Sequence, residues 1–66
     1  MAAKDLQVLR ATFLKEFSAV PAPIRDEIIA VVDGQTFSWA TAYLEISQET
    51  ELGDKILKVL NLLKII

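Results

Sequence analysis

The sequence predicts an all-α fold, a compact bundle of four short helices. Apolar residues recur every three to four positions near both ends of the chain, which is typical of amphipathic helices. Pro21, Pro23 and Gly34 stand between segments of helical length and mark their ends. With 66 residues the chain has room for one hydrophobic core, so residues 1–66 are expected to form a single small domain.

The first helix is predicted over residues 3–20. Its apolar side chains fall on one stripe at about 100° per residue. These are Leu6, Leu9, Phe13, Phe17 and Val20. Pro21 ends the helix, because the residue before a proline is pushed away from the helical conformation.

A second helix is predicted to begin at Pro23 and to end at Gly34. Proline suits the first turn, where its missing N–H has no partner to lose. Asp26 and Glu27 follow at the end of the helix that favours acidic side chains. Gly34 is then the glycine that commonly closes a helix.

The same stretch permits a second interpretation, an α-β-β-α fold with a hairpin around Asp33-Gly34. An Asp-Gly pair between apolar runs is a strong hairpin signal, and Ile28–Val32 is short and rich in β-branched residues. Alternation continues after the pair, at Phe37, Trp39, Thr41 and Tyr43. The helical interpretation is favoured because Pro23 begins a helix well and because Ala40 and Ala42 prefer helix to strand.

The third and fourth helices have clear N-terminal signals. Ser38 can cap a helix that runs to Ser47, and Thr50 can cap one that runs to Ile66. In the last helix the apolar arc covers roughly 220° of the helical wheel, whereas a surface helix of a monomer needs little over 100°. The excess predicts a contact with a second chain, unless neighbouring helices of the same domain bury this helix on all sides.

The composition also favours self-association, since 53 % of the residues are hydrophobic and a domain of this size has little interior. We therefore expect a homo-oligomer whose interface is the apolar face of the last helix. The candidate interface residues are Leu52, Ile56, Val59, Leu60, Leu63 and Ile66. Trp39 and Tyr43 share a face of the third helix and are secondary candidates, although core packing is the favoured explanation for them.

Catalytic, cofactor and metal sites are not expected. The chain has no His and no Cys, the commonest acid–base, nucleophilic and zinc-binding side chains. Glu45, Glu49 and Glu51 offer oxygen ligands, but a solvated acidic face explains them better. The beginning of the sequence shows no signal peptide, and no apolar run approaches the length of a membrane span, so we expect a cytoplasmic protein.

A helix–turn–helix fits the middle of the chain in part, because Ala30 and Gly34 supply the small residue and the turn glycine of such a motif. Charge argues against DNA binding, which depends on neutralising phosphates. From residue 26 to residue 54 there are seven acids and no bases. The sequence therefore predicts a small non-enzymatic protein–protein interaction or regulatory module that self-associates, with a helix–turn–helix-like DNA-binding transcriptional regulator as the alternative. Binding to a membrane surface is not expected, because the chain is acidic overall.

Overall fold

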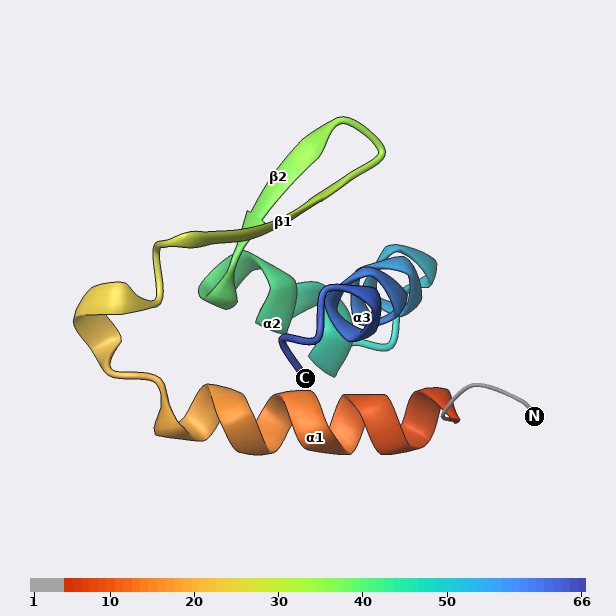
Figure 1. Ribbon diagram of the computed structural model, residues 1–66, viewed down its shortest axis with the longest axis horizontal. Coiled ribbons are helices and arrows are strands. Elements are labelled where there is room, and N and C mark those ends of the chain that lie inside the picture. Colours follow the sequence, from red (N-terminus) through yellow and green to blue (C-terminus); the bar gives the residue numbers. More distant parts are fainter. Residues whose placement is uncertain (1–4) are drawn as a thin grey trace.

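The computed structural model describes residues 5–66, which form a helix, a β-hairpin and two further helices (Figure 1). The elements in chain order are α1 (Leu6–Ala19), a turn of 3₁₀ helix η1 (Ala22–Ile24), β1 (Ile28–Val32), β2 (Gln35–Ser38), α2 (Trp39–Ser47) and α3 (Glu51–Leu62). This is a small α+β fold, so the prediction of an all-α bundle of four helices is wrong. The hairpin of the alternative interpretation is present, and two helices rather than one follow it.

The Asp33-Gly34 pair determines the structure of the middle of the chain, where it forms the turn of the hairpin. Both residues have positive φ, 52° for Asp33 and 78° for Gly34, and they connect an antiparallel pair in which Val32 lies opposite Gln35. Positive φ at both central residues defines the type I′ turn, whose twist matches that of two paired strands. Pro23 does lie in helical structure, but η1 begins one residue before it and lasts only three residues, and the chain is extended from Ile28 to Val32.

The hairpin is stable in this fold because α2 and α3 cover one of its faces; an isolated two-stranded hairpin is marginal in water. Ala30, Val32 and Phe37 point into the core, while Val31 and its partner Thr36 point outward. The register is interrupted at Ile29, which forms a β-bulge.

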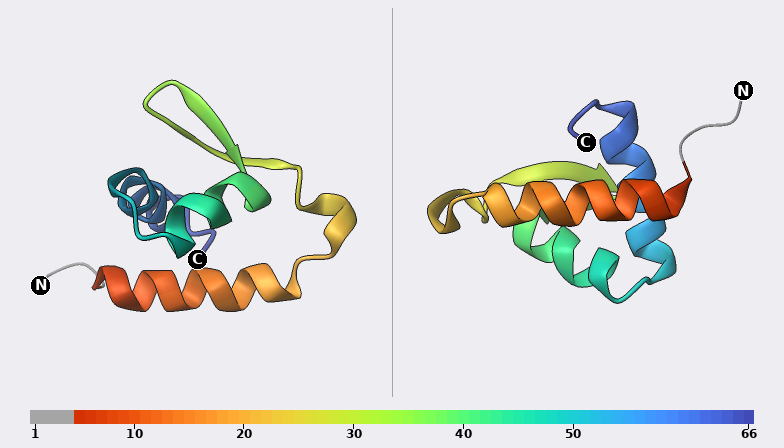
Figure 2. Two further views of the ribbon diagram at one scale, coloured as in Figure 1. Left: turned by 180° about the vertical axis from the view of Figure 1, so that it is seen from behind. Right: turned by 90° about the horizontal axis from the view of Figure 1, so that it is seen from below.

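The core lies between the hairpin and α1, with α2 and α3 in the middle (Figures 1 and 2). α3 packs against α1, α2 and β1, so one helix unites the whole domain. The largest fully buried side chains come from all three helices. They are Leu9, Phe13, Ile46, Ile56, Leu57 and Leu60.

The predicted caps of α2 and α3 are confirmed. Ser38 and Thr41 form a reciprocal capping box at the start of α2, and the Thr50 hydroxyl accepts a hydrogen bond from the Gly53 N–H at 2.9 Å. α1 begins at Leu6 with Asp5 as its cap; the predicted start at residue 3 lies outside the described residues. α3 ends at Leu62, four residues earlier than predicted.

Both α2 and α3 end with a left-handed residue that is not glycine. Glu49 has φ 56° and Lys64 has φ 59°. After each of them the next N–H reaches back five residues, from Thr50 to the Glu45 carbonyl at 3.2 Å and from Ile65 to the Leu60 carbonyl at 2.9 Å. These are Schellman motifs, in which glycine is the preferred left-handed residue.

We expect Glu49→Gly to raise the free energy of unfolding by about 0.5 kcal/mol. The left-handed conformation costs a residue with a Cβ about 1 kcal/mol, and the greater freedom of glycine in the unfolded chain offsets part of this gain. Urea denaturation measures the change. Glu49→Ala is the control, because it removes the same charge but keeps the Cβ. Equal stabilities of the two variants would contradict this explanation.

Candidate interaction surface

The two aromatic candidates, Trp39 and Tyr43, face α1. The Trp39 ring stacks on Phe13 with a centroid separation of 5.6 Å, and the Tyr43 ring stacks on Phe17 at 4.4 Å. Phe13 belongs to the buried core, and Trp39 packs against that core. The two side chains therefore join α2 to α1 within the domain, which agrees with the core-packing alternative considered for them.

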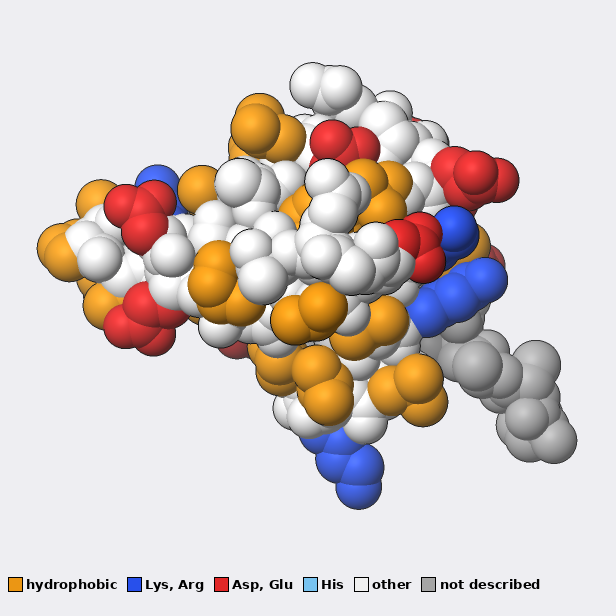
Figure 3. Space-filling model, turned by 90° about the horizontal axis from the view of Figure 1, so that it is seen from above, with side chains coloured by type: hydrophobic (Ala, Val, Ile, Leu, Met, Phe, Trp, Pro, Cys, Tyr) orange, Lys and Arg blue, Asp and Glu red, His pale blue; other side chains and the backbone are white. Residues whose placement is uncertain are grey.

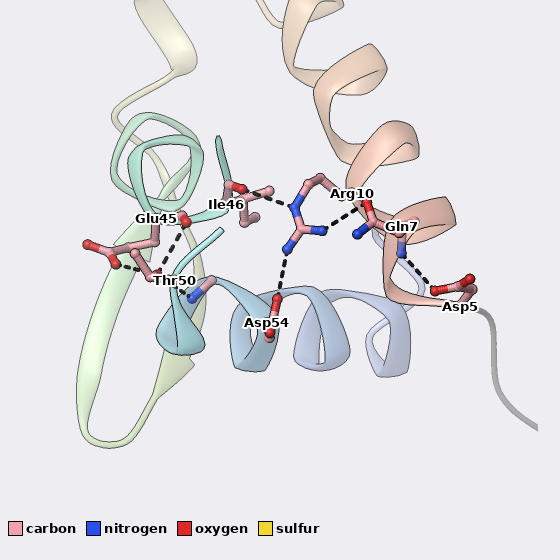
Figure 4. Close-up of polar contacts among 8 residues, drawn as sticks. Asp5, Gln7, Arg10, Glu45, Ile46, Thr50 and Asp54 are labelled. Carbon is pink, nitrogen blue, oxygen red and sulfur yellow. Dashed lines mark hydrogen bonds and ion pairs between the residues drawn. The ribbon is translucent and has the colours of Figure 1, made fainter. Parts of the chain in front are cut away.

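The Arg10 side chain holds the three helices of the domain together (Figure 4). Its side chain is largely buried and makes three hydrogen bonds, to the Ile46 carbonyl at 3.1 Å, to the Gln7 side chain at 3.2 Å and to Asp54 at 2.7 Å. These partners lie on α1, at the end of α2 and at the start of α3. The guanidinium thus connects the three helices and is not free to bind a ligand.

The predicted interface residues, four on α3 and two just after it, do not share one exposed face. Ile56 and Leu60 are fully buried in the domain's own core. Leu52, Val59 and Ile66 are half-buried and pack against that core. Leu63 alone is exposed, with 56 % of its surface accessible. The wide apolar arc of this helix is therefore explained mainly by contacts with its own domain.

Four large apolar side chains on β1 and at the end of α3 are exposed, and only one of them, Leu63, is among the interface residues predicted from the sequence. Ile28 and Val31 on β1 are 56 % and 61 % exposed, and Leu62 on α3 is 79 % exposed. With Leu63 they define what we call the apolar surface. Figure 3, which looks onto the hairpin, shows hydrophobic side chains gathered across this face. Ile28 and Val31 were not among the predicted interface residues, although the strand alternation of the hairpin interpretation places Val31 outward.

Charges of opposite sign lie near the two ends of β1. Lys55 on α3 forms an ion pair with Asp33 in the turn, with 3.0 Å between Nζ and Oδ2. The hydrogen bond and the charge of Asp33 raise the pKa of Lys55 above its usual value. Lys58 follows on the same helix, whereas Asp26 and Glu27 are exposed just before β1. The contribution of the Lys55 pair to stability is small because both side chains are exposed.

The helix–turn–helix considered for the middle of the chain is not formed there. Ala30 lies in β1 and Gly34 lies in the type I′ turn, so neither belongs to a helix. All charged side chains from residue 26 to residue 54 are acidic, which opposes contact with the phosphates of a nucleic acid.

Comparisons with known proteins add no assignment: no protein-family model, no curated protein and no solved structure matches the chain. Within residues 5–66, no three acidic side chains are grouped so that they could hold a metal ion. None of the helices in this part of the chain has the length and apolar character needed to cross a membrane.

Proposed function

We propose that this chain is a small non-enzymatic interaction module that self-associates through the apolar surface. The observation that carries the proposal is the exposure of Ile28, Val31, Leu62 and Leu63, each of which has more than half of its surface accessible. Exposed apolar side chains that lie together on a soluble domain usually mark a site of protein–protein contact. The chain is 53 % hydrophobic. Covering the four side chains takes apolar surface out of water, which favours association.

A second copy is the favoured partner because the remainder of the surface offers little to other ligands. The chain lacks His and Cys, so the commonest acid–base side chain and the thiol nucleophile are missing from its composition. Its acids and bases nearly balance, with a net charge of −2, which gives no strong attraction toward a highly charged partner.

Sedimentation equilibrium of the unmodified chain over a range of concentrations tests the proposal. We expect the apparent mass to rise toward twice the 7.3 kDa of the monomer. Leu63→Glu should shift the equilibrium toward monomer by about tenfold or more, because it places a charge in the apolar contact at a cost above about 1.4 kcal/mol.

Leu44→Glu is the matched control. Leu44 is 54 % exposed, close to the 56 % of Leu63, and it also lies at a helical position. In the right-hand view of Figure 2, α2 and the C-terminal end of α3 lie on opposite sides of α1. We therefore expect Leu44→Glu to leave self-association unchanged. A monomer at every concentration, or equal effects of the two variants, would contradict the proposal.

A further inference from the structure

The two-stranded sheet leaves the outer edge of β1 open. In residues 5–66, β1 has β2 as its single neighbour. Val32 and Gln35 flank a two-residue turn and so form a hydrogen-bonded pair, whereas in the next pair, Val31 and Thr36, the backbone groups point away from each other. The N–H and C=O of Val31 therefore face the open edge and are able to pair with another strand.

This edge carries few of the features that prevent strands from pairing with other chains. Ile28–Val32 contains no charged residue and no proline, the usual protections of an exposed edge. The bulge at Ile29 limits the regular part of the strand to its second half, Ala30–Val32. The other edge belongs to β2, which is one residue shorter and begins with the polar pair Gln35 and Thr36. β1 is thus the edge better suited to pairing.

We infer that a second copy of this chain pairs antiparallel with the open edge of β1, so that the two hairpins form one four-stranded sheet. The inference rests on the proposed self-association and names the element through which it occurs. Two identical strands related by a two-fold axis pair antiparallel, and each then gives the other the same hydrogen bonds. Such pairing is self-complementary and closes after two copies.

The charges at the ends of β1 complement each other in this arrangement. Antiparallel pairing brings the start of β1, with Asp26 and Glu27, to the partner's turn, which Lys55 of α3 contacts; Lys58 follows about one helical turn later. Asp33 in that turn is already paired with Lys55, which reduces its repulsion of the incoming acids. Each end of the joint sheet therefore combines opposite charges.

Arg25 does not neutralise the two acids in advance. Its Nε donates a hydrogen bond to the Val20 carbonyl at 3.0 Å, and its guanidinium lies 4.5 Å from the centre of the Phe17 ring. These contacts turn the side chain toward α1. Asp26 and Glu27 remain exposed and have no ion pair within the described residues.

The end of α3 supplies an apolar contact for the same pairing. Figure 2 shows its C-terminal part extending past the hairpin on the side of β1. A partner strand placed along that edge lies over this extension, so that Leu62 and Leu63, now 79 % and 56 % exposed, lose contact with water. The same arrangement sets the Val31 side chains of the two copies beside each other on the outward face of the joint sheet.

Lysine substitutions at two facing positions test the inference. Val31 and Thr36 lie opposite each other on the outward face of the hairpin, and both are exposed. Val31→Lys places two like charges beside each other across the joint between copies, which opposes pairing. We expect it to weaken self-association at least tenfold in sedimentation equilibrium, whereas Thr36→Lys, one strand farther away, should change it less than twofold. Circular dichroism checks that both variants are folded.

Single cysteines give a second measurement that does not depend on weakening the dimer. The chain has no cysteine of its own, so Val31→Cys and Thr36→Cys each introduce one thiol. Across an antiparallel joint, facing or diagonal side chains lie within about 8 Å, whereas each additional strand adds about 5 Å per copy. A bismaleimide of about 8 Å should therefore join Val31→Cys chains and leave Thr36→Cys chains single.

The possible results separate this inference from the proposed function. Loss of self-association in Val31→Lys alone, together with cross-linking of Val31→Cys alone, supports pairing along β1. Self-association that resists Val31→Lys but is lost in Leu63→Glu would overturn the edge pairing and leave the interaction module standing. A chain that is monomeric at all concentrations would overturn both.

Discussion

Replacing Ile56 with glutamate should unfold the domain, whereas the same replacement at Leu63 should leave its helix content unchanged. Ile56 is fully buried at the centre of the core, between the other helices and β1, and Leu63 is 56 % exposed. Deleting a buried isoleucine costs about 2–5 kcal/mol, and placing an unpaired charge in its position adds to this cost. Small domains have only about 3–5 kcal/mol of stability, so the total exceeds what the fold can tolerate.

Far-ultraviolet circular dichroism and the fluorescence of the single tryptophan, Trp39, give the result directly. Trp39 stacks on Phe13 in the native domain, so its emission should shift to longer wavelength when Ile56→Glu unfolds the chain. Leu63→Glu should keep the native spectra at a concentration where the chain is monomeric. If Ile56→Glu kept native spectra and only lost self-association, α3 would instead present Ile56 to another chain.

The second large effect is expected at Gly53, where α3 crosses α2. A Cβ at this position would lie 2.5 Å from the Glu45 carbonyl oxygen and 3.0 Å from the Ile46 Cα. Both are backbone atoms of α2, so the helices would have to separate. The Ile46 carbonyl also accepts a hydrogen bond from Arg10, which ties this crossing to α1.

We expect Gly53→Ala to lower the free energy of unfolding by about 2 kcal/mol, within the range for overpacking a tight contact. The sign is informative because alanine usually stabilises a helix by about 1 kcal/mol relative to glycine. Urea denaturation measures the change. Gly34→Ala is the control: its Cβ would meet nothing within 4 Å, so only the positive φ of 78° opposes it, at about 1 kcal/mol. A Gly53→Ala variant as stable as the native chain would contradict the close crossing.

The helices were predictable from the sequence wherever local chemistry decides the structure. Ser38 and Thr50 are caps that act within four residues of themselves, and both begin helices in the structure. The apolar stripe of α1 likewise identifies the residues that reach the core, Leu9 and Phe13. Where α3 ends was less predictable, because the left-handed residue that ends it is Lys64 and not a glycine.

The hairpin was harder to predict because its first strand is short. Ile28, Val31 and Val32 fit a helical spacing as well as a strand over only five residues. The helical interpretation gave more weight to Pro23 than to Asp33-Gly34. In the fold, the turn fixes two strands at once, while Pro23 influences only the three residues of η1.

The candidate surface was predictable only in part, because exposure depends on which elements cover a helix. α1, α2 and β1 bury Ile56, Leu57 and Leu60 from three sides and leave Leu62 and Leu63, at the C-terminal end of the helix, exposed. Helical periodicity predicts the width of the apolar face of a helix. It does not predict which turns of the helix are covered by neighbouring elements. Val31 is recognisable as a surface residue only in the hairpin interpretation, whose strand alternation places it outward.

Pairing of two copies along β1 is tested most directly by nuclear magnetic resonance on a mixture of isotope-labelled and unlabelled chains. Filtered experiments detect only contacts between protons of different copies. Pairing along the open edge predicts such contacts between the backbone protons of Ala30–Val32 in one copy and of β1 in the other. Intermolecular contacts confined to the helices, or none at concentrations where the mass has doubled, would contradict it.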